Sequence, residues 1–382
     1  MNNPSLRRSV LGKVLVPGAL LALTVPDIAY ADVAGVTVRS PAATMGPSTP
    51  FTGVSSRADC RDGDGLVSGG GVNQAIGSDG ARNGNHVLGM APGSDGLTEY
   101  SGSPGVVGAD ARHWLAFGGS GGNAGPAFST TSYAVCLSTK RMRHTQVVMN
   151  RIAGPSAPQS AKLVVATCPT GTLLLGGGAR TTPAGVGSLK VVAGFPTFND
   201  AAHDFGSKPA ADGETNPDSW TAVGGIGGGH DDANTTYVYA ICSGDRVNTS
   251  GMSTRVHFRE AVGPTAGGTG RTATVGCGDD QGQSRHGRGH EGKKHDSGIL
   301  ISGGAAASGG NVTSTGFTKA GSGGTHLNGS FPSDADGTPV RDGSTTAAYW
   351  TAAIHAGGSP SPNTYTDVWA LCLNTHRGHG KR

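Results

Sequence analysis

The sequence is poor in charged residues and in long apolar runs, and both shortages limit what the protein can be. Asp, Glu, Lys and Arg make up 14% of the chain, and the formal net charge is +3. That charge falls to about +1 for residues 32–382, so we expect no specific binding of nucleic acid and no general attraction to an anionic membrane. No segment supplies the ~20 apolar residues of a membrane-spanning helix, so the mature chain is expected to have no membrane span.

Helical patterning is also missing. The chain contains 67 Gly, and each Gly costs a helix interior about 1 kcal/mol relative to Ala. No stretch keeps a helical apolar period for three turns. Short apolar runs alternate instead with clusters of Gly, Ser, Thr and Asp, which is typical of strands and turns. The sequence therefore predicts an all-β fold.

Catalytic motifs are absent as well. The chain has no G-x-S-x-G or H-E-x-x-H motif and no convincing Ser, His and Asp order. Two His–carboxylate neighbours, His203-Asp204 and His230-Asp231-Asp232, stand in Gly-rich segments where turn chemistry accounts for them. We expect no catalytic residues and no cofactor.

The first 31 residues have the features of an export signal. Arg7 and Arg8 begin a basic region, 14–25 is a short apolar segment, and 29–31 (Ala-Tyr-Ala) fits a cleavage site. The paired arginines also occur in twin-arginine signals, so the sequence leaves the export pathway open. We expect a secreted or cell-surface protein.

A pattern that occurs three times predicts the domain organisation. A Trp opens a W-x-A motif, and an aromatic-Ala-aliphatic-Cys run closes 22 residues later. The fixed spacing favours core positions for the Trp and Ala of each copy over an exposed Trp that stacks on a sugar. These residues are Trp114, Ala134 and Cys136, then Trp220, Ala240 and Cys242, then Trp350, Ala370 and Cys372.

The repeats divide the mature chain into 32–140, 141–246 and 247–375, followed by a basic tail at 376–382. Each repeat holds two cysteines, and an even number in an exported chain favours disulfides over metal ligation. Pairing within repeats gives every copy the same bond, whereas exchange between repeats is the main alternative. The expected bonds are Cys60–Cys136, Cys168–Cys242 and Cys277–Cys372, each worth about 4–5 kcal/mol in the chain-entropy model.

A run of small residues follows the first Cys of each repeat, at 66–71 (LVSGGG), 173–178 (LLLGGG) and 300–305 (LISGGA). Glycine within a strand marks the close approach of another backbone or a ring, so we interpret the run as structural. The last strand of the middle repeat, 237–242, has no charge on either face and requires burial on both sides. We therefore favour one pseudo-threefold, β-prism-like body; three tandem small β-sandwich domains are the alternative.

The order Cys, Leu-Leu-Gly-Gly-Gly-Ala, Pro, Trp-x-Ala and Tyr-Ala-x-Cys resembles a β-rich module of secreted actinobacterial and other bacterial proteins. The resemblance covers most of residues 33–375 and is best at 168–242. It implies an extracellular β module that occurs in threes, and it implies no activity because it brings no catalytic residues.

The third repeat departs from the pattern by an insertion at 279–298. This segment contains His286, His290 and His295 among several Arg and Lys residues. His is a common metal ligand, so a metal-binding or polyanion-binding loop is one interpretation. The basic neighbours oppose a bound cation, and we favour a solvent-exposed loop.

Binding is better expected in the loops between the Pro and Trp positions, at 93–113, 197–219 and 333–349. They vary in length, and loops on a rigid β scaffold commonly carry recognition. The sequence therefore predicts a secreted, non-catalytic binding or adhesion protein for glycan or cell-wall material. A self-assembling surface or matrix protein and an extracellular hydrolase are the alternatives, and the oligomeric state is left open.

Overall fold

The computed structural model describes residues 34–75, 84–122, 128–183, 188–228, 233–278, 298–320, 324–358 and 362–375. Over these residues the fold is almost entirely β, as predicted. None of the helices in the described ranges is long and apolar enough to cross a membrane. Residues 32–382 belong to one compact unit.

Each repeat supplies six main strands in the same order. In the first repeat they are β1 (Gly35–Arg39), β3 (Gly53–Asp59), β4 (Leu66–Ala75), β5 (Asn85–Asp95), β8 (His113–Ser120) and β9 (Ser129–Ser138). In the second they are β10 (Thr145–Ala153), β11 (Ala161–Thr167), β12 (Leu174–Thr182), β13 (Lys190–Thr197), β14 (Ser219–Gly225) and β15 (Thr235–Ser243). In the third they are β16 (Met252–Val262), β17 (Gly270–Gly276), β18 (Ile299–Ser308), β19 (Thr325–Ser333), β20 (Tyr349–Ala356) and β21 (Tyr365–Thr375). Smaller elements lie in the connections: β2 (Thr44–Met45), β6 (Thr98–Glu99), β7 (Gly105–Ala109), the 3₁₀ element η2 (Ala201–Gly206) and α1 (Val312–Thr315).

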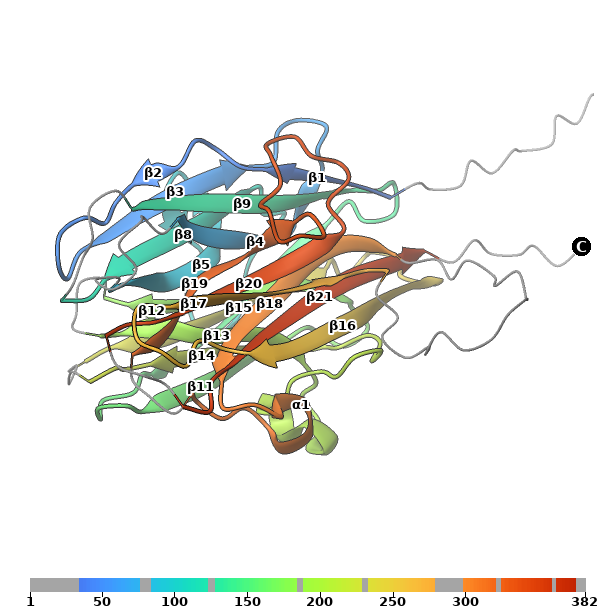
Figure 1. Ribbon diagram of the computed structural model, residues 1–382. Helices are drawn as coiled ribbons and strands as arrows, with labels where there is room; N and C mark the ends of the chain where they lie inside the picture. The colour runs from blue at the N-terminus through green and yellow to red at the C-terminus, as the bar shows by residue number, and fades with distance from the viewer. Residues whose placement is uncertain are drawn as a thin grey trace, which may run out of the picture. The chain divides into compact units, whose positions relative to one another are not determined.

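Three antiparallel sheets each join half of one repeat to half of another (Figure 1). Sheet A has the order β1-β9-β4-β19-β20-β17, sheet B β3-β8-β5-β12-β15-β10-β7, and sheet C β11-β14-β13-β18-β21-β16. The pairing of β4 with β19 joins the first repeat to the third and closes the ring. The protein is therefore one pseudo-threefold body, and the alternative of three tandem sandwich domains is wrong.

The glycine runs meet where the three sheets approach one another. A β-bulge at the same place in β4, β12 and β18 makes Gly69, Gly176 and Ser302 equivalent. A Cβ atom on Gly69 or Gly176 would lie 2.6 Å from the Cβ of Ser302, so the three positions converge on the pseudo-threefold axis. The position of the β-bulge, and not the letters G-G-A, sets the register of the third repeat. The alignment of its glycine run with those of the other repeats from sequence alone is therefore wrong by one residue.

The next two positions of each run explain the remaining glycines. Gly70, Gly177 and Gly303 lie directly against the Trp ring of their own repeat. The positions after them, Gly71, Gly178 and Gly304, face backbone carbonyls of Ser330, Met90 and Gly194 in a neighbouring repeat. The three Trp side chains and the repeated Ala before each Cys are fully buried. Both the ring contact and the backbone contact expected from the sequence are present.

The disulfides are Cys60–Cys136, Cys168–Cys242 and Cys277–Cys372, which is the pairing within repeats that was expected. In each bond, one cysteine directly follows an edge strand of one sheet, and the other cysteine lies in an inner strand of a second sheet. The first links sheets B and A, the second links C and B, and the third links A and C. The bonds thus connect the three sheets in a covalent ring, and such bonds are typical of oxidising compartments.

Candidate functional site

The site is built where the first two strands of a repeat, which belong to different sheets, lie side by side. In the second repeat, β10 of sheet B lies beside β11 of sheet C, and in the third repeat β16 lies beside β17. The equivalent strands of the first repeat are β1 and β3. We call these three places the first, second and third corners, numbered by their repeat.

A groove of about 640 Å³ opens at the second corner. Its walls are residues 148–152 of β10 and 163–167 of β11. Two of the loops predicted from the sequence also reach it, since Pro104 and Gly105 belong to 93–113 and Asn199 belongs to 197–219. The structure therefore brings two of the three candidate loops to one groove.

The three loops do not gather in a single place. Strand β7 of the first loop pairs with β10, Thr215 of the second bridges to Arg255 of β16, and Ser344 of the third bridges to Val38 of β1. Each loop therefore lies against the edge of a different sheet. The third loop contributes nothing to the groove of the second corner.

The loop that brings Pro104 and Gly105 to the rim of the groove is anchored by Glu99. Arg180 Nε donates to Glu99 Oε1 at 3.0 Å, and Tyr239 OH donates to Glu99 Oε2 at 3.2 Å. The Arg180 guanidinium also lies 3.9 Å from the centre of the Phe117 ring. Burial, together with the Glu99 charge, raises the pKa of Tyr239, so its hydroxyl stays protonated as a donor. These contacts hold this part of the rim in one position.

A side chain spans the floor of the groove. Asn150 Nδ2 donates to the carbonyl oxygen of Val165 at 2.8 Å and ties β10 to β11. At the third corner, Arg259 occupies the equivalent position and donates to the carbonyl of Thr274 at 3.3 Å. The shorter Asn side chain makes the same link while filling less of the space above it.

The second corner is apolar where the other two are polar. Leu163 and Val165 of β11 correspond to Ser55 and Arg57 of β3 and to Thr272 and Thr274 of β17. On the facing strand, Val148 corresponds to Arg39 in the first corner and to His257 in the third. The substitution of charged and hydroxyl groups by aliphatic ones is thus confined to the second corner.

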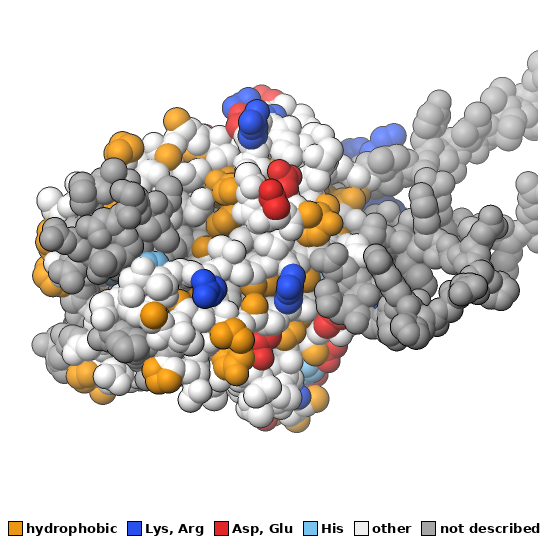
Figure 2. Space-filling view, in the orientation of Figure 1, with side chains coloured by type: hydrophobic (Ala, Val, Ile, Leu, Met, Phe, Trp, Pro, Cys, Tyr) orange, Lys and Arg blue, Asp and Glu red, His pale blue; other side chains and the backbone are white. Residues whose placement is uncertain are grey.

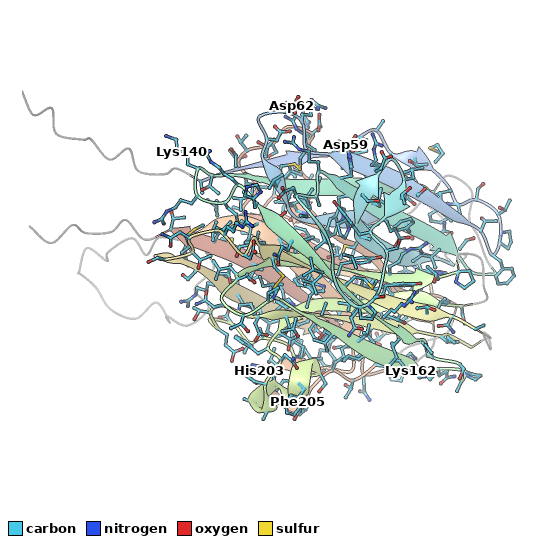
Figure 3. All side chains as sticks on the ribbon, turned by 180° about the vertical axis from the view of Figure 1, so that it is seen from behind. Asp59, Asp62, Lys140, Lys162, His203 and Phe205 are labelled. Carbon is cyan, nitrogen blue, oxygen red and sulfur yellow. A yellow bond between two sulfur atoms is a disulfide. The ribbon has the colours of Figure 1, made fainter. Side chains whose placement is uncertain are left out.

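Ion pairs occupy the first corner instead. Arg39 forms two hydrogen bonds of 2.7 Å with Asp64, and this contact holds the pKa of the Asp64 carboxyl below its usual range. Arg57 lies 2.8 Å from Asp59, which also contacts His113 at 2.7 Å. Figure 3 shows Asp59 and Asp62 on the upper side of the body and Lys162 and Phe205 on the lower side.

The chemistry of the groove combines an apolar floor with a few polar groups. Ile152 is 39% exposed and extends the aliphatic surface of Leu163 and Val165. Asn150 and Asn199 offer amide groups, and Arg151 is the one charged side chain that lines the groove. A concave, largely apolar surface with few polar groups is the usual form of a ligand site.

An exposed aromatic ring lies on a neighbouring element. Phe205 of η2 is 65% exposed, and a Cβ on the adjacent Gly206 would touch the side chain of Val165. Asp204 and Phe205 have φ angles of 47° and 51°, a region that ordinary residues enter at a cost of ~1–2 kcal/mol. Strain of this kind is concentrated at functional sites. Phe205 therefore presents one more apolar group to solvent near β11, and Figure 3 shows it on the lower side of the body.

His203 does not pair with its sequence neighbour Asp204. Its Nδ1 lies 2.9 Å from Asp200 Oδ1, and its Nε2 lies 3.2 Å from Glu214 Oε2. The two carboxylates are on opposite sides of the ring, and Phe198 packs on it at 4.5 Å between ring centres. The arrangement stabilises the loop around η2.

Sequence reasoning missed a carboxyl pair in the third repeat. Glu260 of β16 and Asp367 of β21 are direct cross-strand partners, although 107 residues of sequence hide the relationship. Asp367 is fully buried, and burial with the Glu260 charge raises its pKa to about 8. Only the register of the two strands reveals this pair. Its burial separates it from any ligand in the groove.

Metal binding finds no support among the described residues, where no three His, Cys, Asp or Glu side chains gather as a metal group. The candidate ligands His286, His290 and His295 lie outside the described residues. The same holds for the export signal, for 230–232 and for the basic tail. Those four interpretations stay predictions.

No model in a scan of protein families matches the chain, and a search of curated proteins finds no match. The resemblance to a secreted bacterial module therefore stays a prediction.

Proposed function

We propose that this protein is an exported, non-catalytic binding protein that holds an extended glycan of the cell envelope in the groove of the second corner. The signal-like residues 1–31 and the three disulfides support export, because disulfides persist in oxidising compartments. The difference between the corners is the observation that carries the proposal. Three equivalent strand pairs share one fold, and in the second pair aliphatic residues line an open groove.

The groove suits a sugar chain better than a compact cofactor. Its two walls are strand segments, so it follows the strands for several residues at ~3.3 Å each. Leu163, Val165 and Ile152 supply a surface for the apolar faces of sugar rings. The amides of Asn150 and Asn199 can bind hydroxyl or acetamido groups, and Arg151 favours a glycan that carries carboxylates.

The test is the affinity of the purified protein for fragments of envelope glycans, measured by calorimetry. The informative variant is Leu163→Thr with Val165→Thr, which copies Thr272 and Thr274 of the third repeat into the second. We expect at least a tenfold weaker Kd, equivalent to about 1.4 kcal/mol. Ser55→Thr on β3 is the matched control and should bind as wild type does. Equal affinity of the double variant and the wild type would exclude this groove as the site.

Self-assembly is the second candidate, and one observation favours it. Within the described ranges, strand β11 ends sheet C with β14 as its strand partner, so its other edge faces the groove beside Leu163, with the Val165 carbonyl held by Asn150. An edge strand with apolar side chains is a template for pairing with another chain. Sedimentation velocity over a wide concentration range separates the two functions. Concentration-dependent dimers that the same double variant abolishes, without glycan binding, would favour assembly over recognition.

A further inference from the structure

A segment of the third repeat packs over β16 and β21 of sheet C, and it is longer than its counterparts. Residues 309–324 join β18 to β19, whereas 76–84 and 183–189 make the same connection in the first and second repeats. We call residues 309–320, which include α1, the strap. Figure 1 shows α1 beside η2 at the bottom of the body.

The first half of the strap is tied to the carboxyl pair of Glu260 and Asp367. Asn311 N donates to Glu260 Oε2 at 2.7 Å, and Gly310 N donates to Ser308 Oγ at 3.0 Å. The Ser308 hydroxyl in turn interacts with the Asp367 carboxyl. The strap is therefore connected to both acids of the pair.

The second half of the strap covers an aromatic side chain. Phe317 N donates to the carbonyl oxygen of Ser207 at 2.9 Å, and the Phe317 ring stacks on Phe195 with 6.0 Å between ring centres. Phe195 is fully buried, and its ring centre lies 5.5 Å from that of Trp369. Movement of the strap would remove Phe317 and expose part of this aromatic surface.

The carboxyl pair beneath the strap cannot hold two charges at low cost. Asp367 is 0% exposed and is the direct cross-strand partner of Glu260. Neighbouring carboxylates oppose each other's ionisation, and a buried charge is costly. The groups that act on the Asp367 carboxyl are the Ser308 hydroxyl and Glu260, whereas the charge of Lys319 in the strap acts on Lys190 of β13. Asp367 is therefore a neutral acid while the strap covers it.

The carboxyl pair and the long connection occur in the same repeat. The residues equivalent to Asp367 are Thr131 in the first repeat and Tyr237 in the second. In the second repeat, Arg151 stands where the third has Glu260. The third repeat is thus the one that combines a buried acid with a segment able to cover it.

We propose that the strap is a pH-sensitive device, which closes over the neutral Asp367 and opens when Asp367 ionises beside Glu260. Opening moves Phe317 away from Phe195 and presents an aromatic surface next to η2. The device does not depend on the proposed glycan site.

The direction of the pH effect follows from the two states of Asp367. In the closed state, burial and the Glu260 charge raise its pKa to about 8. In the open state, water reaches the carboxyl, and its pKa returns toward the ordinary value of about 4. Closure is therefore most favourable below pH ~4, and its equilibrium constant falls by at most about tenfold per pH unit up to pH ~8.

The test is hydrogen exchange of the folded protein, followed by mass spectrometry at pH 5 and pH 8 and corrected for the pH dependence of the chemical exchange. Protection of peptides from 309–320 should fall at least about tenfold between the two pH values. Amides of β15, an inner strand of sheet B, should exchange far more slowly than the strap at both. Equal protection of the strap at pH 5 and pH 8 would overturn the proposal. Exchange of β15 as fast as that of the strap would also overturn it, because the opening would then be global.

Variants identify the group that controls the strap. Asp367→Asn keeps the shape of the neutral acid and cannot ionise, so protection of the strap should be the same at both pH values. Glu260→Gln removes the facing charge while its amide oxygen can still accept from Asn311, so the fall should be smaller than in the wild type. Asp245→Asn, a change at an exposed acid between β15 and β16, is the matched control and should keep the full fall. A full fall in Asp367→Asn would refute the role of this acid.

Discussion

Replacing Gly69 by Ala should destabilise the protein through a contact between repeats that are far apart in sequence. The added Cβ would lie 2.6 Å from the Cβ of Ser302 and 3.2 Å from the carbonyl oxygen of Ile301. Overpacking of a tight core costs about 1–3 kcal/mol. In a unit of this size, each kcal/mol lowers Tm by roughly 1.5 °C, so a fall of about 2–4 °C is expected.

The same geometry predicts a selective rescue. Ser302→Gly removes the side chain that the new methyl group meets, so adding it to Gly69→Ala should restore most of the lost stability. It should not rescue Gly176→Ala, because a Cβ at that position would also lie 2.5 Å from the backbone oxygen of Ser68. A backbone atom cannot be removed by mutation. The rescue therefore distinguishes the two equivalent glycines.

Differential scanning calorimetry of the single and double variants measures the coupling directly. Gly35→Ala is the control, because a Cβ there has nothing within 4 Å. Additive effects of Gly69→Ala and Ser302→Gly would refute the close approach of β4 and β18 on the axis. Equal rescue of both glycine variants would show that the backbone contact at Gly176 is absent.

Two further predictions concern the disulfides and a buried acid. Cys168→Ala with Cys242→Ala opens a loop of 74 residues, and it should lower the free energy of unfolding by up to about 4 kcal/mol; unchanged denaturant midpoints would contradict this. Asp367 has its pKa raised to about 8, so the folded state keeps a proton that the unfolded chain releases above pH ~4. Stability should fall as the pH rises from ~4 to ~8, by at most about 1.4 kcal/mol per pH unit, and Asp367→Asn should flatten this slope in urea titrations at several pH values. A slope that is the same in the variant would show that Asp367 is not its source.

The sequence predicts the fold well because the residues that define the repeat have strict steric requirements. Trp114, Trp220 and Trp350 each require a glycine beside the ring, and each Cys requires a partner at a fixed place. Such requirements leave a visible pattern in one repeat that can be compared with the next. The all-β class, the disulfide pairing and the single pseudo-threefold body all follow from them.

The exchange of strands between repeats could not be predicted, because the glycine at Gly71 signals the close approach of a backbone without showing that β19 of the third repeat supplies it. The same limit applies to the carboxyl pair beneath the strap. Glu260 and Asp367 are far apart in the sequence, and only the register of β16 and β21 makes them neighbours.

The groove was predicted only in part. The loops 93–113 and 197–219 were expected to bind, and both reach it, but they supply its rim. Its walls come from β10 and β11, whose apolar residues carry no signal in the sequence that separates them from ordinary strand core. Their exposure became visible only when the equivalent residues of the other corners were compared. On the face seen in Figure 2, charged groups are few and scattered, so charge would not have marked a site there either.

The central claim is that the groove of the second corner recognises an envelope glycan, and one titration tests it most directly. Wild-type protein and the variant Leu163→Thr with Val165→Thr are titrated with the same glycan fragments, after equal Tm values have shown that both are folded. Saturable binding by the wild type and at least tenfold weaker binding by the variant is the predicted result. Identical isotherms for the two proteins would contradict it.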